Sequence, residues 1–179
     1  FVGTGDGKLV VLEAATGRLL WEFLAAPVEQ QTRWYGHIVN RWPVLGGAVV
    51  QGDTVYTAAG FQDCNGLHVY ALNTKDGSVK WESHDGASGG EYGIEGAWGL
   101  YGNLAIGAGR LWVQTATLVP GSFDLETGAH TFTKDSGDGR RRGKNLTVLA
   151  DKWVIPGGRR MSSTHAKWSD TDRNVGLTV

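Results

Sequence analysis

The chain has 179 residues, and its 17 Lys and Arg nearly balance its 18 Asp and Glu, giving a formal net charge of −1. This balance offers no global attraction to nucleic acid or to an anionic membrane, and no apolar run is long enough to span a bilayer. The 28 Gly, 4 Pro and 8 Trp are typical of an all-β protein with many tight turns. The single cysteine, Cys64, excludes an intrachain disulfide.

Short stretches rich in β-branched and aromatic residues, bounded by Gly, Asp and Asn, predict strands along most of the chain. In chain order they lie near 1–4, 8–13, 18–24, 46–51, 54–59, 67–73, 78–83, 102–107, 110–116, 121–125, 129–134, 145–150 and 152–156. The connections 25–44 and 84–101 are expected to be long loops. Both ends of the sequence resemble interrupted strands, so we expect a section of a longer polypeptide.

A pattern of anchor residues recurs 60 residues further along the chain. The matching pairs are Leu12 and Leu72, Gly17 and Gly77, Trp21 and Trp81, and Glu22 and Glu82. A weaker third copy keeps Gly128 and carries Phe132 in place of the tryptophan. Self-similarity at such a period indicates repeated supersecondary units, and we interpret them as the blades of a β-propeller.

Each anchor has a physical role in this interpretation. The glycines fall at tight turns between strands, where a positive φ excludes most other residues. The tryptophans follow on the outermost strand, where a large flat side chain can cover the neighbouring blade. Leu12 and Leu72 are expected on the inward face of the preceding strand. We therefore predict that Gly17, Trp21, Gly77, Trp81, Gly128 and Phe132 dock one blade on the next.

Residues 66–73 (GLHVYALN) followed by 76–82 (DGSVKWE), with the earlier copy that ends at Trp21-Glu22, resemble the PQQ-like repeat of the quinoprotein alcohol dehydrogenase-like superfamily. WD40 repeats end in Trp-Asp rather than Trp-Glu, and the paired glycines lack the regular spacing of Kelch repeats. The resemblance implies four-stranded antiparallel blades, of which this chain holds about three to three and a half. The expected units are a blade part at 1–24, blades at 44–83 and 102–134, and a partial blade at 145–179.

The resemblance also raises the question of cofactors. Dehydrogenases of this superfamily bind PQQ on the propeller axis with Ca²⁺, and many contain two adjacent cysteines. This chain has one cysteine and no segment that matches the cofactor motifs, so the sequence predicts no catalytic residue, no metal ligand and no cofactor. Ligand-binding groups are expected in the inter-blade loops. The candidates are Arg33, Trp34, Tyr35, His37, Arg41 and Trp42 in one loop, and Glu91, Tyr92, Glu95 and Trp98 in the next.

The preferred interpretation is a non-catalytic binding or scaffold module for a protein, glycan or small ligand. The remaining blades would come from the same polypeptide or from a partner chain. One alternative is part of a PQQ- and calcium-dependent quinoprotein dehydrogenase that oxidises alcohols or sugars, and another is a structural module that stacks through its open blade edges. The resemblance further implies a bacterial protein that is periplasmic, at the cell surface or secreted.

Overall fold

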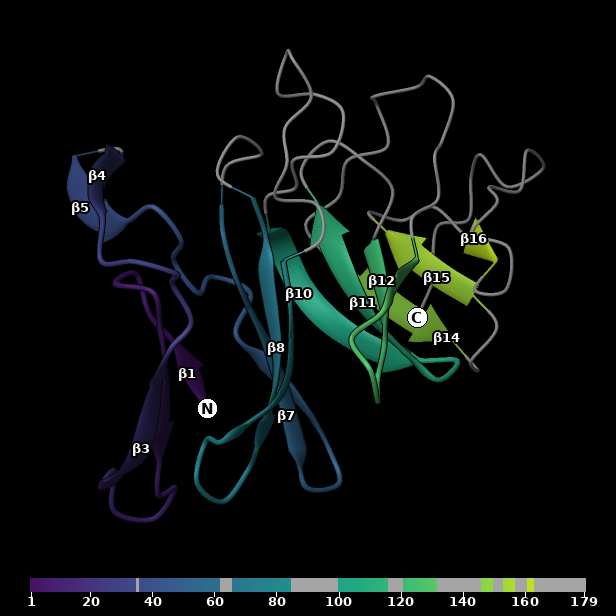
Figure 1. The fold of residues 1–179 in the computed structure, drawn as a ribbon, viewed down its shortest axis with the longest axis horizontal. Coiled ribbons are helices and arrows are strands. Elements are labelled where there is room, and N and C mark those ends of the chain that lie inside the picture. The colour runs from purple at the N-terminus through teal and green to yellow at the C-terminus, as the bar shows by residue number, and fades with distance from the viewer. Residues whose placement is uncertain are drawn as a thin grey trace, which may run out of the picture.

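The computed structural model describes residues 1–34, 36–61, 66–84, 100–115, 121–131, 146–149, 153–156 and 161–162. The regular elements of these residues are all β-strands, and the paired strands are antiparallel, so the predicted all-β class is confirmed. Figure 1 shows the sheets following one another in chain order, from the purple strands near the N-terminus to the yellow-green strands. Within the described residues no helix is long and apolar enough to cross a membrane.

Each sheet is a meander of consecutive strands. The first contains β1 (Val2–Gly3), β2 (Lys8–Leu12) and β3 (Leu19–Leu24). The second sheet has four strands, β6 (Ala48–Gln51), β7 (Thr54–Ala59), β8 (His68–Asn73) and β9 (Val79–Ser83). The third sheet also has four strands, β10 (Leu100–Gly107), β11 (Arg110–Thr115), β12 (Gly121–Asp124) and β13 (His130–Thr131). The last contains β14 (Leu146–Leu149), β15 (Trp153–Pro156) and β16 (Met161–Ser162).

The repeat extends to the details of strand pairing. In the first sheet the register between β2 and β3 shifts at Val11 and Leu12, and in the second sheet the register between β8 and β9 shifts at the equivalent Ala71 and Leu72. A shift of this kind is a local irregularity that bends a strand and increases its twist. The two copies therefore share their backbone irregularity as well as their anchor residues.

Among the described residues, the core forms two apolar layers between neighbouring sheets. The first layer joins Leu9 of the first sheet to Val55 and Leu72 of the second. The second layer joins the opposite face of the second sheet, including Ala71 and Trp81, to the third sheet. Because successive side chains of a strand point to opposite faces, the second sheet contributes alternate residues to both layers.

The indole of each anchor tryptophan lies against the turn of the following sheet. Trp21 Nε1 donates a hydrogen bond to the Thr74 carbonyl at 3.1 Å, and Trp81 Nε1 donates one to the Leu125 carbonyl at 2.9 Å. Each acceptor comes three residues before the turn glycine, Gly77 or Gly128. A Cβ at Gly77 would lie 2.8 Å from Trp21 Cε3, and one at Gly128 would lie 2.5 Å from Trp81 Cε3. Glycine thus supplies both the positive φ of the turn and the space for the indole.

The expectation that Leu12 faces inward is wrong. Leu12 is 39% exposed, whereas its counterpart Leu72 is fully buried against the first sheet. No described sheet covers the corresponding face of the first sheet, so Leu19 and Leu24 are also exposed. The repeat gives Leu12 and Leu72 the same position within their sheets, but the burial of each side chain depends on whether a neighbouring blade covers it.

The connection between the first two blades also differs from the expected loop. It forms a separate two-stranded sheet of β4 (Gln31–Trp34) and β5 (His37–Asn40). Figure 1 shows this hairpin standing apart from the blades. Regular backbone pairing determines on which face of the hairpin each side chain lies.

Candidate functional site

The β4–β5 hairpin presents side chains to solvent. Trp34 pairs with His37 across the turn, where Gly36 adopts a φ of +83°. Arg33 and His37 are exposed, and Ile38 is 68% exposed. The described residues place no third strand beside this hairpin. The hairpin therefore offers an accessible apolar side chain, Ile38, together with the cationic Arg33 and the imidazole of His37. Such a ribbon is suited to contact with another molecule.

Asn40 fixes the base of the hairpin to the first blade. Its backbone N–H donates to the Gly5 carbonyl at 2.8 Å, and its side-chain amide donates to the Val28 carbonyl at 3.2 Å. Its side-chain oxygen accepts from the Trp42 N–H at 2.9 Å, and the residue is only 5% exposed. A buried amide satisfied in this way holds the local backbone in one arrangement.

Arg41 and Trp42 continue from the hairpin towards the second blade. The Arg41 guanidinium lies 5.4 Å from the Trp42 ring centroid, in the geometry of a cation–π contact. Arg41 Nη1 also donates to Gln30 Oε1 at 3.2 Å. Trp42 contacts the His68 ring edge to face, with 6.1 Å between centroids. These two side chains therefore connect the hairpin to the second blade.

The structure places part of the predicted ligand set on this hairpin and its base. Arg33 and His37 lie on the strands, Arg41 and Trp42 lie at the base, and Trp34 lies in β4. The remaining predicted residues fall outside the described part of the chain, as does the predicted docking residue Phe132; they are Tyr35, Glu91, Tyr92, Glu95 and Trp98.

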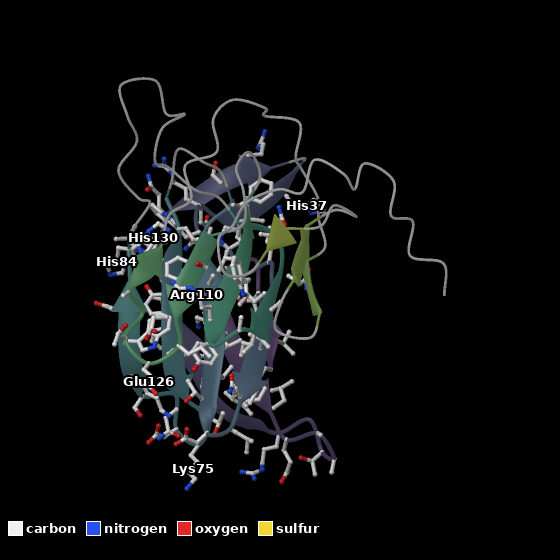
Figure 2. The ribbon with its side chains drawn as sticks, turned by 90° about the vertical axis from the view of Figure 1, so that its right-hand side faces the viewer. His37, Lys75, His84, Arg110, Glu126 and His130 are labelled. Carbon is white, nitrogen blue, oxygen red and sulfur yellow. The ribbon has the colours of Figure 1, made fainter. Side chains whose placement is uncertain are left out.

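A pair of histidines that sequence reasoning missed lies beside Trp42. His68 at the start of β8 and His84 just after β9 have their Nδ1 atoms 2.7 Å apart. Figure 2 shows His84 and His37 towards one end of the molecule and Lys75 at the opposite end. The two histidines lie on either side of the predicted turn at Gly77, but the register shift between Ala71 and Leu72 means that counting outwards from the turn does not pair them.

Burial determines the protonation of this neighbourhood. The pKa of His68 is lowered to about 4, mainly by desolvation and to a smaller extent by electrostatic repulsion from His84. Glu82 acts in the opposite direction and raises the pKa. His68 is therefore neutral at pH 7. Burial, with Glu82 adding to the effect, raises the pKa of Tyr70 to about 12, so its phenol also stays uncharged.

Metal-ligating side chains do not cluster in the part of the chain that the structure describes. It contains no group of three or more His, Cys, Asp or Glu side chains placed to hold a metal ion. A shallow hollow between the turns of the second and third blades is lined by residues without ionisable side chains, so it offers no acid–base chemistry; they are Val50, Gln51, Ile106, Gly107, Ala108, Gly109 and Leu125. No catalytic step can be derived from this set.

Comparisons with known proteins identify related folds. A family model described as "Outer membrane protein assembly factor BamB" matches residues 1–97. A search of curated proteins gave no match.

Three solved structures are similar over most of this chain. BamB from Moraxella catarrhalis is 22% identical with a TM-score of 0.57, over 92% of this chain and 43% of its own. The quinohemoprotein alcohol dehydrogenase from Comamonas testosteroni is 15% identical with a TM-score of 0.65, over 94% of this chain and 32% of its own. A second such enzyme, from Pseudomonas putida HK5, is 12% identical with a TM-score of 0.64, over 93% of this chain and 32% of its own. These matches confirm the predicted β-propeller fold, and the chain spans less than half the length of each.

Proposed function

Because the chain belongs to the PQQ-like repeat family described as "Outer membrane protein assembly factor BamB", we propose that it is part of a non-catalytic β-propeller that binds a protein ligand. The match confirms the repeat assignment made from the sequence. The description of the family names an assembly factor, a role that involves other proteins. It also supports a periplasmic, cell-surface or secreted location in a bacterium.

The observation that carries the proposal is the β4–β5 hairpin between the first two blades. Its exposed Ile38 supplies apolar area, and Arg33 supplies a cation that can bind a carboxylate with two parallel hydrogen bonds. Arginine is enriched at protein interfaces, and the buried centre of an interface is more apolar than its rim. An open strand edge can also pair with an extended segment of a partner. Binding of this kind requires no cofactor.

The proposal can be tested by photo-crosslinking in cells. A benzoylphenylalanine placed at Ile38 is expected to form a specific adduct with one protein. The same residue placed at Lys75, which is exposed at the opposite end, is the matched control and should form none. The adduct partner would then be purified, and Ile38→Asp should weaken its binding at least tenfold while Lys75→Asp leaves it unchanged. Equal crosslinking at both positions, or unchanged binding by Ile38→Asp, would refute the proposal.

The alternative of a quinoprotein dehydrogenase is favoured by one observation, the TM-scores of 0.65 and 0.64 to two quinohemoprotein alcohol dehydrogenases. It is tested by incubating the purified protein with PQQ and Ca²⁺ and following dye-linked oxidation of alcohols and sugars. Turnover that depends on both PQQ and Ca²⁺ would support the dehydrogenase and contradict the non-catalytic proposal.

A further inference from the structure

The His68–His84 pair lies on a part of the chain that the proposed function does not use. In the antiparallel ladder of β8 and β9, Val69 pairs with Ser83. His68 precedes Val69 and His84 follows Ser83, so the two histidines occupy the next opposed positions. Cross-strand neighbours of this kind have Cβ atoms about 4.5–5.5 Å apart, which lets their side chains meet.

We propose that His68 and His84 form a chelating site for a divalent transition-metal ion, with copper(II) preferred, through their facing Nδ1 atoms. The 2.7 Å between these atoms belongs to a shared hydrogen bond, in which one Nδ1–H donates to the other Nδ1. A metal ion would take the place of that shared proton once His68 carries its hydrogen on Nε2. The hydrogen moves from Nδ1 to Nε2 of the same ring, so the exchange releases no proton.

The two Nδ1 atoms are close enough together for one metal ion to bind both. With metal–nitrogen bonds of about 2.0–2.1 Å, two ligands at a right angle are about 2.9 Å apart, whereas two tetrahedral ligands are about 3.3 Å apart. The observed 2.7 Å lies nearer to the right-angle value. Square-planar and tetragonal sites with nitrogen and oxygen ligands favour Cu(II) or Ni(II), and Cu(II) binds more tightly in the divalent series. Water would fill the other positions.

The surroundings of His84 supply a second indication. Its other ring nitrogen, Nε2, lies 3.5 Å from Glu82 Oε1, on the side away from His68. A metal-bound histidine characteristically directs its second N–H to a carboxylate, which fixes the tautomer and makes the ring a better ligand. Glu82 thus directs the Nδ1 lone pair of His84 towards the proposed ion.

Packing holds the His68 ring in place. The Trp42 ring meets it edge to face, and the adjoining Val69 is fully buried in the core. Tyr70 contacts the His84 ring, with 6.3 Å between centroids. His68 stands at the start of β8 and His84 directly follows β9, so both imidazoles lose little further freedom on binding and the second ligand adds its affinity as a chelate.

The test is titration of the purified protein, without a polyhistidine tag, with CuCl₂ in a non-coordinating buffer, read by calorimetry and by electron paramagnetic resonance. The spectrum should show two equivalent imidazole nitrogens at one site. His84→Gln, at an exposed position, should weaken the affinity at least about tenfold and leave one nitrogen at most. Glu82→Gln should keep both nitrogens and weaken the affinity by about 10–100-fold.

His37→Gln is the matched control, because His37 is also exposed but lies on the hairpin. It should retain both the affinity and the two-nitrogen spectrum. A wild-type spectrum without two coupled imidazoles, or unchanged affinity in His84→Gln, would overturn the proposal and leave the pair as a hydrogen bond only. Neither result depends on whether the hairpin binds a protein.

Discussion

Substitution of the turn glycine Gly128 by alanine tests the docking of one blade on the next. Gly128 has a φ of +70°, and a Cβ there would lie 2.5 Å from Cε3 and 2.8 Å from Cδ2 of the Trp81 indole. The left-handed backbone costs a residue with a Cβ about 1–2 kcal/mol. Forcing the indole away should cost a further 1–3 kcal/mol or so, as other overpacked cores do. The expected loss is therefore about 2–5 kcal/mol.

Gly17 provides the matched control. It occupies the same turn position in the first blade, with a φ of +71°. Apart from its two chain neighbours, no described residue has an atom within 4 Å of the position that a Cβ would take there. Gly17→Ala should therefore lose only the backbone part, about 1–2 kcal/mol. The free energies of unfolding would be measured by urea denaturation followed by circular dichroism.

A double-mutant cycle separates the two contributions. In a Trp81→Ala background the indole is gone, so Gly128→Ala should cost about as much as Gly17→Ala does in the parent protein, and the coupling should be about 1–3 kcal/mol. Equal losses for Gly17→Ala and Gly128→Ala in the parent, or no coupling in the cycle, would refute the docking argument.

Three other substitutions test separate features. Trp81→Phe keeps a ring but loses the hydrogen bond to the Leu125 carbonyl, and should cost about 1–2 kcal/mol in the same denaturation assay. Ala108 has a positive φ of 53°, a conformation that is strained for a residue with a Cβ. Ala108→Gly should therefore raise the urea midpoint or leave it unchanged, and a lower midpoint would contradict the assignment of strain. Hydrogen bonds from Thr127, first from its backbone N–H, hold the pKa of Asp124 below its usual value. The ionised Asp124 therefore stabilises the fold above about pH 4, and that stability is lost as pH falls through the lowered pKa. Asp124→Asn should reduce this acid sensitivity in thermal melts from pH 7 to pH 2.

The blade pattern could be predicted because it rests on local chemistry that repeats. Gly77 and Trp81 carry the turn and the covering indole within five residues, so their copy at Gly17 and Trp21 fixes the strands around them. The exposure of Leu12 could not be predicted in the same way. Its burial depends on a neighbouring blade, and the repeat alone contains no information about whether such a neighbour is present.

The candidate site was predictable in its residue types but not in its shape. Arg33 and His37 were singled out by their position between blades, and the structure adds that they stand on paired strands. The available signal for this hairpin was Gly36, a residue suited to a tight turn, with β-branched and aromatic residues on both sides of it. The His68–His84 pair required the register across β8 and β9, and single residues do not reveal register.

The tryptophan-to-turn hydrogen bond has a consequence for insertions and deletions. Trp21 reaches an acceptor 53 residues away in the sequence, and Trp81 reaches the equivalent acceptor only 44 residues away. The same contact therefore tolerates a difference of nine residues in the intervening chain. Connections between blades can lengthen, shorten or exchange their contents without disturbing how the blades meet. A hairpin such as β4–β5 can therefore be exchanged for another inserted segment with a different binding surface, while the contact between the blades is kept.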